Sequence, residues 1–350
     1  MHEITVFTSL AELIKNNNKL IKLFQNCYNL YMKKIYLAPL EGVTDSIYRN
    51  TFLKYYVGVD KVYTPFISPN STFKFTTREF KDIDPTKNDP AITVPQLLTN
   101  NATHFLWAAT EISKLGFKEI NFNLGCPSGT VVAKKKGSGL LYYPEELDKL
   151  LYEIFEGMDK ACDEAGVDTP RISIKTRLGK HEPEEFYEIL AIYNKYPITE
   201  LTVHPRIQSD YYREPVKIDF FDYAVSHSKA PLVYNGEIKS VADIKKIEEN
   251  YKSVNAIMIG RGLISYPELT VCYKNDYPDD SINLKKLLDF HNDLLSQYTA
   301  TLSGEKPVLH RMKEFWSYWK INFPDKEKTI KKIRKSNRLN EYKSLVSTLI

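Results

Sequence analysis

Short apolar runs alternate with longer segments of helical periodicity along most of the 350-residue chain. The apolar runs are rich in β-branched residues and lead into Gly, Pro, Asn or Asp, which is typical of buried strands that precede helices. Helices are expected at Asp45–Tyr56, Ala102–Leu115, Pro144–Ala165, Glu182–Tyr196 and Val241–Tyr251. Eight runs are expected to be strands: Ile35–Leu40, Lys61–Phe66, Ala91–Leu97, Glu119–Asn123, Arg171–Thr176, Glu200–His204, Pro231–Asn235 and Ala256–Gly260.

Strands that alternate with helices predict βαβ units and a parallel sheet. Eight units in about 240 residues match the number and length of a closed (β/α)8 TIM barrel, so we expect an α/β fold of this kind. In the alternative, an open doubly wound sheet, a glycine-rich phosphate-binding turn follows the first strand. Here the first run leads into Leu40-Glu41-Gly42, and the glycine-rich turns come after the seventh and eighth runs, where barrels bind phosphate.

The alternation stops near Tyr277, and the rest of the chain has only helical periodicity. Residues 35–280 are therefore expected to form the barrel domain, and residues 281–350 a small all-helical C-terminal domain. Residues 1–34 are an N-terminal extension with apolar positions at roughly helical spacing. The C-terminal helices are expected at Leu284–Thr299, Val308–Ile321, Lys326–Arg334 and Glu341–Leu349.

Positive charge is concentrated at the C-terminal end. Residues 281–350 carry 14 Lys and Arg against 7 Asp and Glu, a net charge of +7. The whole chain carries +4, which leaves −3 for the first 280 residues. A basic tail on a mildly acidic body suggests a polyanion as its partner, although a solvated helical surface without a partner has the same composition.

The four cysteines, at 27, 126, 162 and 272, are widely spaced and form no CxxC pair or zinc-type cluster. This usage fits a reducing compartment, and no metal site is expected. The N-terminus lacks the pattern of a secretory signal, and no apolar run approaches the ~20 residues of a membrane span. We therefore expect a cytoplasmic protein that does not cross a membrane.

The expected barrel collects polar residues at the C-terminal ends of its strands, where barrel enzymes carry their sites. Asn235-Gly236 and Gly260-Arg261-Gly262 end the seventh and eighth runs. Glycine there lets backbone N–H groups approach a phosphate, and the Arg261 guanidinium can bind it through two hydrogen bonds. Each glycine alone is more typical of an ordinary turn, but the pair of turns at these two strands favours a phosphate site.

Lys175 and His204 end adjacent runs, and Gln96 lies further round the barrel. Together they suit a flat heterocycle that carries carbonyl groups and ring nitrogens. A flavin is such a ring, and a nearby cation stabilises its anionic reduced form. A buried ion pair for Lys175 and a structural histidine for His204 are the alternatives.

Cys126 ends the fourth run on a Gly-Cys-Pro turn, ahead of the Lys134–Lys136 run. A thiol near cations can act as a nucleophile, a general acid or a base, and the sequence alone leaves these roles and a buried structural cysteine open. Arg177, Arg206 and the lysine run add positive charge at the same mouth. With aromatics such as Tyr212 they suit a flipped-out nucleotide of a polyanion.

These strand ends together resemble the tRNA-dihydrouridine synthase family, in particular the bacterial group that acts on U16 of tRNA. The resemblance runs from about residue 35 to the C-terminus. It rests on YLAPLEGVTD at 36–45, PQLL at 95–98, NFNLGCPSGTVVAKKKGSGLL at 121–141, SIKTRLG at 173–179, LTVHPRIQSDYYREP at 201–215, LVYNGEI at 232–238, IMIGRGLISYPEL at 257–269 and HRMKEFWSYWKINFP at 310–324.

The resemblance implies an FMN-binding barrel followed by a helical tRNA-binding domain. It implies that NADPH reduces FMN, that a hydride reaches C6 of a uracil, and that Cys126 gives a proton to C5, which yields 5,6-dihydrouridine in tRNA. It places Asn123, Arg177 and Arg206 at the tRNA substrate. The residues that it implies for FMN are Ala38, Pro39, Leu40, Gln96, Lys175, His204, Asn235, Gly236, Glu237, Gly260 and Arg261.

The chain also departs from the family pattern. Thr64-Pro65 replaces the Thr-Glu pair that is common at the second strand end, and Gln208 stands where a basic residue is common. Two other functions stay open. One is an FMN oxidoreductase like dihydroorotate dehydrogenase, which would not need the basic tail. The other is a non-catalytic RNA-binding protein on a barrel scaffold, which would not need Cys126, Lys175 and His204. A monomer is expected.

Overall fold

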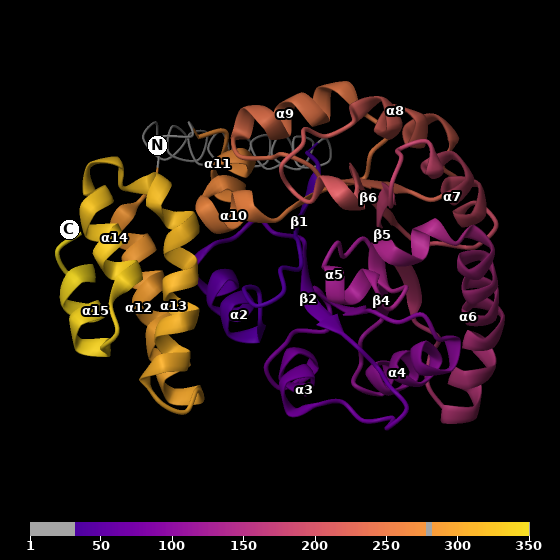
Figure 1. The fold of residues 1–350 in the computed structure, drawn as a ribbon, viewed down its shortest axis with the longest axis horizontal. Coiled ribbons are helices and arrows are strands. Elements are labelled where there is room, and N and C mark those ends of the chain that lie inside the picture. Colours follow the sequence, from indigo (N-terminus) through magenta and orange to yellow (C-terminus); the bar gives the residue numbers. More distant parts are fainter. Residues whose placement is uncertain (1–31, 278–281, 350) are drawn as a thin grey trace, which may run out of the picture. The chain divides into compact units, whose positions relative to one another are not determined.

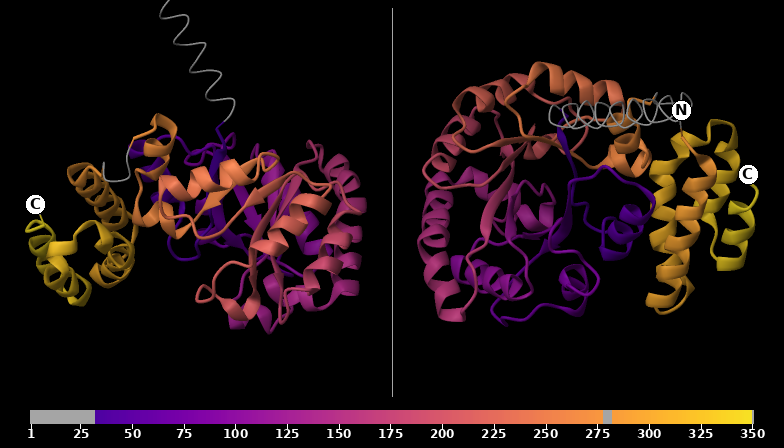
Figure 2. Two further views of the ribbon diagram at one scale, coloured as in Figure 1. Left: turned by 90° about the horizontal axis from the view of Figure 1, so that it is seen from above. Right: turned by 180° about the vertical axis from the view of Figure 1, so that it is seen from behind.

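The computed structural model describes residues 32–277 and 282–349 (Figure 1). Eight parallel strands pair in sequence order, and the first also pairs with the last, so the sheet closes into a barrel. Helices surround it, and the C-terminal helices lie at one side (Figures 1 and 2). The predicted TIM barrel with C-terminal helices is confirmed. Its strands are β1 Lys34–Leu37, β2 Lys61–Ile67, β3 Thr93–Leu97, β4 Glu119–Leu124, β5 Arg171–Gly179, β6 Leu201–Ile207, β7 Leu232–Tyr234 and β8 Ala256–Ile259.

Helices follow the strands as the alternation predicts, with several short ones that the periodicity did not reveal. The helices of the barrel are α2 Ser46–Tyr55, α3 Thr77–Ile83, α4 Ala102–Lys114, α5 Gly129–Val132, α6 Pro144–Ala165, α7 Glu185–Tyr193, α8 Ile218–His227, α9 Val241–Asn250, α10 Arg261–Ser265 and α11 Leu269–Asn275. The C-terminal helices are α12 Leu284–Thr301, α13 Glu305–Trp319, α14 Glu327–Lys335 and α15 Leu339–Val346.

Capping residues explain where several helices begin and end. The Asp45 side chain accepts a hydrogen bond from the Tyr48 backbone N–H and so caps α2. Helix α6 ends at Gly166, whose φ of 67° is left-handed. Helix α13 begins at Glu305, three residues before the predicted start. Pro307 is tolerated in its first turn, because the N–H that proline lacks has no intrahelical partner there.

The interior of the barrel is polar on one side and apolar on the other. Glu119, Asn121 and Asn123 alternate along β4 and are buried, and alternate residues of a strand share one face. At the N-terminal ends of the strands, Lys61 Nζ lies 2.8 Å from Glu119 Oε2 and 2.6 Å from Glu200 Oε2. The apolar side is a buried cluster of Tyr36, Ala38, Tyr63, Val94, Val233, Ala256 and Met258.

Aromatic packing holds the C-terminal helices against α2, beside which they lie in Figure 1. The Tyr48 ring stacks on Phe315 of α13, with centroids 5.3 Å apart, and meets the edge of Phe290 of α12 at 5.7 Å. The Tyr298 hydroxyl on α12 donates a 2.7 Å hydrogen bond to Asp45 Oδ1. Asp45, which caps α2, therefore also binds α12. These contacts and the Tyr48–Phe315 stack set the position of α13 beside the barrel.

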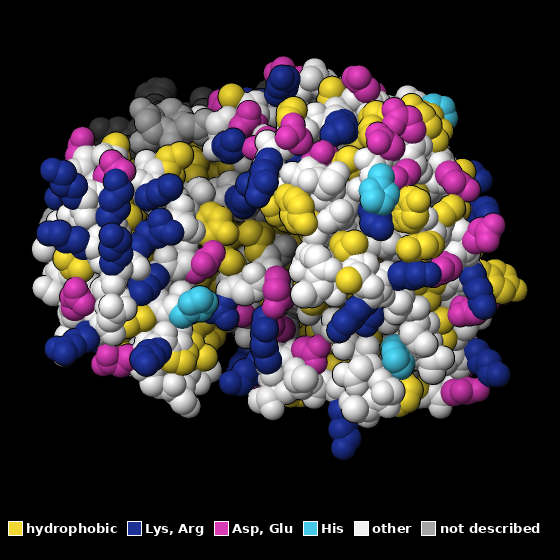
Figure 3. Space-filling model, in the orientation of Figure 1, with side chains coloured by type: hydrophobic (Ala, Val, Ile, Leu, Met, Phe, Trp, Pro, Cys, Tyr) yellow, Lys and Arg dark blue, Asp and Glu magenta, His cyan; other side chains and the backbone are white. Residues whose placement is uncertain are grey.

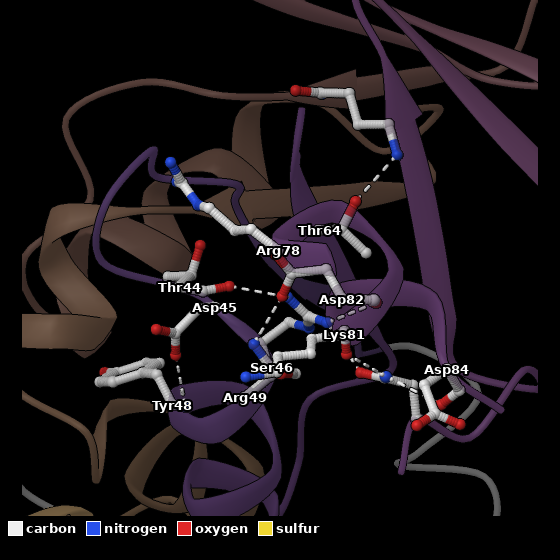
Figure 4. Close-up of polar contacts among 12 residues, drawn as sticks. Thr44, Asp45, Ser46, Tyr48, Arg49, Thr64, Arg78, Lys81, Asp82 and Asp84 are labelled. Carbon is white, nitrogen blue, oxygen red and sulfur yellow. Dashed lines mark hydrogen bonds and ion pairs between the residues drawn. The ribbon is translucent and has the colours of Figure 1, made fainter. Parts of the chain in front are cut away.

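A buried arginine ties α2 to α3 (Figure 4). Arg49 Nη1 donates to the Thr44 carbonyl at 2.8 Å and to Asp82 Oδ1 at 3.1 Å. Arg49 Nη2 donates to the Asp82 carbonyl and to Asn88 Oδ1, at 2.9 and 2.7 Å. Asp82 also accepts from the Ser46 backbone N–H at 2.6 Å. This network anchors the helix against which the C-terminal helices pack.

A buried histidine lies in the core of the C-terminal helices. The Tyr342 hydroxyl accepts a 2.8 Å hydrogen bond from Trp316 Nε1 and lies 2.6 Å from His291 Nε2. His291 Nδ1 lies 3.0 Å from Asn292 Oδ1, so the neutral ring donates through Nδ1 and accepts through Nε2. Burial lowers the pKa of His291 to about 4.

We expect His291 to make the folded state sensitive to acid. Because its folded pKa lies below the ordinary 6.5, its contribution is complete above about pH 6.5 and is lost as the pH falls to about 4. The loss is on the order of 3 kcal/mol. Urea unfolding of His291→Gln at pH 7 and pH 4.5 should therefore show a smaller fall in stability than the native chain. His104→Gln, at a half-buried position on α4, is the control and should keep the native slope.

The barrel and the C-terminal helices belong to one compact unit, Lys34–Ile350. The predicted domain boundary at 280/281 and nearly all of the 1–34 extension lie outside the described residues. Within residues 32–277 and 282–349, no helix is long and apolar enough to cross a membrane. The same residues contain no group of three His, Cys, Asp or Glu side chains placed to hold a metal ion.

Candidate functional site

A cavity of about 370 Å³ opens at the C-terminal ends of the strands. It brings together side chains that are up to 280 positions apart in the sequence, from Ala38 to Tyr318. Of the residues predicted for the site, only Glu237 is not part of its lining. The predicted residues that do line it are Ala38, Pro39, Leu40, Gln96, Asn123, Cys126, Lys175, Arg177, His204, Arg206, Asn235, Gly236, Gly260 and Arg261.

The loop that carries Cys126 is held from several sides. Asn123 Oδ1 accepts hydrogen bonds from the backbone N–H groups of Gly125 and Cys126, at 3.0 and 2.9 Å. The Ser138 hydroxyl donates to the Cys126 carbonyl at 2.8 Å. Gly137 has a φ of 55°, and a Cβ there would lie 2.9 Å from the Cys126 carbonyl oxygen. A glycine is therefore required for the loop to fold back onto the cysteine.

The environment of Cys126 keeps its sulfur protonated at neutral pH. Burial raises the pKa of the thiol, and this outweighs the opposing effects of the Ser128 backbone N–H and the cations Lys175 and Arg177. A protonated thiol that faces a cavity can donate a proton but is a poor nucleophile. Of the three roles that the sequence left open, the protonated thiol favours that of a general acid.

Lys175 is a cation without a protein partner. No hydrogen bond or ion pair to its Nζ occurs among the residues that the structure describes, although the side chain lines the cavity inside the barrel. Burial, with a further contribution from Arg177, lowers its pKa to about 7. A partly buried amine without a partner is costly, so this part of the cavity is suited to a ligand that brings hydrogen-bond acceptors or negative charge.

Arg177 is a brace for the surrounding loops. Its Nε donates to the Gly125 carbonyl at 3.1 Å, its Nη1 to the Ile207 carbonyl at 2.8 Å and its Nη2 to the Tyr211 carbonyl at 2.7 Å. The side chain is buried, and each of its three nitrogens has a backbone partner. It joins the Cys126 loop to the loop after β6, so it shapes the cavity; its predicted contact with the uridine stays a prediction.

A chain of polar contacts runs behind the cavity from His204 to Arg261. Arg206 Nη1 lies 3.0 Å from His204 Nε2, and because arginine only donates, the histidine proton is on Nδ1. Glu237 Oε1 accepts from Arg206 Nη2 at 2.7 Å and from Arg261 Nη2 at 3.0 Å. The Glu237 carboxylate, which the resemblance assigns to the cofactor, thus lies behind Arg261 and holds it in place.

Charge fixes the protonation states of this chain. Burial and the neighbouring cations, with Arg177 first and Lys175 next, hold the pKa of His204 well below its usual range, so the ring is neutral. Burial raises the pKa of Glu237, but hydrogen bonds from Arg206 and Lys239 outweigh it and lower the pKa to about 2. Arg261 therefore faces the cavity with its charge and its direction set by an ionised carboxylate.

Close packing within the protein requires the glycines at strands seven and eight. A Cβ on Gly236 would lie 2.1 Å from the Tyr234 hydroxyl oxygen, and one on Gly262 would lie 2.0 Å from the Ile238 carbonyl oxygen. Gly260 approaches Leu40 Cδ1, to which a Cβ would come within 3.2 Å. The glycines Gly236 and Gly260 line the cavity with the unpartnered amine of Lys175 and the guanidinium of Arg261, and these donors fit a planar ring with an attached phosphate, as in FMN.

The sequence reasoning did not find several lining residues. Phe66 comes from the second strand end, and Glu314 and Tyr318 come from α13. The predicted helix around 308–321 gave the right element, but helical spacing shows which face is buried and not what it packs against. Tyr212 was noted as an aromatic, and its ring lies between Arg177 and Arg261, at 5.3 and 4.6 Å from the guanidinium carbons.

The lysine run after Cys126 has a different environment from the one expected. Lys134, Lys135 and Lys136 are not among the lining residues of the cavity. Lys135 Nζ lies 2.6 Å from Glu146 Oε1 and 4.0 Å from the centre of the Tyr143 ring. Contacts with Glu146 and Tyr143 therefore explain the position of the Lys135 side chain without a bound nucleic acid.

Comparison with known proteins identifies relatives of the whole described unit. A sequence model of the family described as "Dihydrouridine synthase (Dus)" matches residues 36–348. The tRNA-dihydrouridine(16) synthase of Vibrio vulnificus is 29% identical over 328 residues, which are 90% of this chain and 96% of that protein. The tRNA-dihydrouridine(16) synthase of Shewanella oneidensis is 28% identical over 310 residues, which are 86% of this chain and 93% of that protein.

Solved structures with the same fold are more distant in sequence. Histamine dehydrogenase from Rhizobium sp. 4-9 superposes with a TM-score of 0.53 at 14% identity and covers 71% of this chain and 46% of its own. A 2-naphthoyl-CoA reductase complex gives a TM-score of 0.53 at 11% identity, over 71% of this chain and 50% of that chain. At such identities the likeness is one of fold.

Proposed function

Because this chain belongs to the dihydrouridine synthase family, we infer that it is a flavin-dependent enzyme that reduces uridine in tRNA to 5,6-dihydrouridine. The observation that carries this is the cavity, in which a protonated thiol on a braced loop, a buried amine without a partner and a directed arginine line one space. The same combination disfavours a non-catalytic RNA-binding protein. Coverage of the C-terminal helices by the family model disfavours the dihydroorotate-dehydrogenase alternative.

The residues for the cofactor follow from the chemistry of the lining. We propose that Lys175 and Gln96 bind the polar edge of the FMN ring, and that Ala38, Pro39 and Leu40 contact its apolar part. Arg261 and the backbone at Gly236 then bind the phosphate. Bound FMN would supply the hydride, and we propose NADPH as the reductant that returns the flavin to its reduced form.

The thiol of Cys126 completes the reaction. The uracil ring gains a hydride at C6 and a proton at C5, and the C5–C6 π bond is lost. We propose that Cys126 Sγ holds the C5 proton, because burial keeps the thiol protonated. Asn123 and Arg206 are proposed to orient the uridine beside it, and their own hydrogen bonds already restrict them. The thiolate that remains lies near Lys175 and Arg177, which stabilise it until it is reprotonated.

We propose uridine 16 as the target, since several of the curated relatives carry that position in their names. Mapping dihydrouridine in tRNA from cells with and without this chain tests the proposal. Loss at position 16 alone is expected when the chain is absent. Loss at another position would refute the assignment of the target, and unchanged tRNA would refute the activity. The purified protein should be yellow and release FMN on denaturation.

The basic C-terminal helices are proposed to bind the tRNA backbone. Figure 3 shows Lys and Arg side chains gathered over these helices, beside a recess that separates them from the barrel. On α14, Lys328, Lys332 and Lys335 are exposed and follow i, i+4, i+7 spacing, which places them on one face. Glu314 and Tyr318 of the same helical group line the cavity, so tRNA held by these helices passes the site.

Replacing the three lysines on α14 by glutamine should weaken tRNA binding about tenfold or more. Each phosphate contact releases counterions, so the slope of log affinity against log salt should fall by about 2 to 3. Salt titrations of tRNA binding by filter retention measure both quantities. The matched control changes Lys118, Lys149 and Lys160, which are exposed on the barrel, and should leave both unchanged. An equal loss in both triple variants would show that net charge alone, and not this face, is responsible.

Substitution is a sharper test than removal of the C-terminal helices. Truncation near residue 280 would also remove Glu314 and Tyr318 from the wall of the cavity and expose the aromatic contact with α2. Its effect on tRNA binding would then mix the loss of a charged face with damage to the site.

A further inference from the structure

A continuous chain of side-chain hydrogen bonds connects the Cys126 loop to the ion pair at the opposite end of the barrel. Asn123 Nδ2 donates to Gln96 Oε1 at 2.7 Å, and Gln96 Nε2 donates to Asn121 Oδ1 at 2.8 Å. Asn121 Nδ2 donates to Ser173 Oγ at 3.0 Å. The Ser173 hydroxyl donates to Glu119 Oε1 at 2.9 Å. All five side chains are at most 7% exposed.

The two ends of this chain set its direction. At the loop, the backbone N–H groups of Gly125 and Cys126 can only donate, so Asn123 must present its oxygen to them. At the other end, the ionised Glu119 can only accept, because its carboxylate pairs with Lys61. Every amide between them has one orientation that satisfies both ends, so their orientation follows from their partners.

The chain depends on the strand register as well as on the residue types. Gln96 of β3 is paired with Asn121 of β4, and Asn121 is paired with Ser173 of β5. The three side chains therefore lie side by side across neighbouring strands, one layer below Asn123 and the cavity. Asn121 and Ser173 do not line the cavity, so they touch neither of the ligands proposed for it. A barrel interior filled with branched apolar residues would not need polar groups here.

We propose that Asn121 and Ser173 are positioning residues, which hold the Asn123 and Gln96 amides and through them the loop that carries Cys126. The rigid anchor is the Glu119–Lys61–Glu200 cluster, which is set between strand ends. The loop is the part that must stay within a fraction of an ångström of its working position, since small displacements of a reacting group are costly. This inference rests on the proposed role of Cys126, and its test includes a measurement that does not require turnover.

Asn121→Leu and Ser173→Thr are the informative pair. Leucine keeps the volume of Asn121 but removes the acceptor for Gln96 Nε2 and the donor to Ser173 Oγ, whereas threonine keeps the hydroxyl that accepts from Asn121 and donates to Glu119. For Asn121→Leu we expect kcat for dihydrouridine formation to fall about tenfold, with KM for tRNA within about twofold. Ser173→Thr should stay within about threefold of the native chain. Ser173→Ala, a smaller change, should fall between the two and serves if the leucine variant does not fold.

The rate of Cys126 alkylation by iodoacetamide in the flavin-free protein gives the independent measurement. Burial is the main cause of the raised pKa of this thiol, so a loosened loop should alkylate faster and at lower pH. Asn88→Ala removes a buried amide from the Arg49 network instead and should change neither kcat nor the alkylation profile. Equal behaviour of Asn121→Leu and Ser173→Thr, or a native alkylation profile in Asn121→Leu, would overturn the proposal. Faster alkylation in a chain that makes no dihydrouridine would support the positioning role and refute the proposed function.

Discussion

Replacing Cys126 by alanine is expected to lower the rate of dihydrouridine formation by about 10²–10⁴-fold, the usual contribution of a general acid. The thiol is the group beside the cavity that burial keeps protonated at neutral pH. FMN should remain bound, because Lys175 and Arg261 do not depend on the sulfur. Mass spectrometry of tRNA after single-turnover reactions measures the rate, and the visible absorption spectrum measures bound flavin.

Two variants bracket this result. Cys126→Ser keeps the size of the side chain, but its hydroxyl is a much weaker acid, so its rate should lie close to that of alanine. Cys162→Ala changes a cysteine that is buried in α6 and packs on Met158, and it should leave the rate unchanged. A Cys126→Ala chain that keeps the native rate would remove Cys126 from the reaction.

Replacing Lys175 by methionine is expected to weaken FMN binding about ten- to a hundredfold. This corresponds to the ~1.5–3 kcal/mol of a hydrogen bond from a charged group. Fluorescence titration of flavin-free protein with FMN measures the affinity. Lys149→Met, at an exposed position on α6, is the matched control and should bind FMN as the native chain does.

The same substitution should stabilise the flavin-free protein. The folded pKa of Lys175 is about 7, against an ordinary 10.5, so the folded state carries a penalty that is complete below about pH 7 and disappears as the pH rises toward 10.5. The penalty is on the order of 5 kcal/mol. The native flavin-free chain should therefore gain stability between pH 7 and 10, and Lys175→Met should be more stable at pH 7 without that gain. Urea unfolding at several pH values measures this difference in stability. A Lys175→Met chain that is less stable than the native chain at pH 7 would contradict the assignment of Lys175 as a strained, ligand-binding amine.

The barrel and most of its site could be predicted because strand ends are readable along the chain. Each apolar run is followed by polar residues, and in a closed parallel barrel the C-terminal ends of all strands meet at one end of the barrel. Local sequence therefore predicted that Gln96, Cys126, Lys175, His204 and Arg261 would converge. Strand lengths were less predictable, since β5 and β6 continue beyond Thr176 and His204 to Gly179 and Ile207.

What the sequence did not reveal depends on partners that are remote along the chain. The resemblance assigned Glu237 to the cofactor, and the sequence did not show that its carboxylate also accepts from Arg206 of β6 and from Arg261 after β8. Arg177 carries a charge that suits a nucleic acid, and the sequence did not show that its three nitrogens also donate to backbone carbonyls of two loops. Glu314 and Tyr318 reach the cavity through the docking of α13 on the barrel, which helical periodicity does not encode.

The position of α13 has a consequence for engineering. Since Glu314 and Tyr318 form part of the cavity wall and Phe315 packs on Tyr48, the C-terminal helices are not an interchangeable attachment to a self-sufficient barrel. Chimeras that exchange these helices between relatives would alter the active-site wall together with the surface that we propose binds RNA. A graft intended to redirect the enzyme to another nucleotide would have to transfer α2 and the barrel-facing side of α13 together, from the same relative.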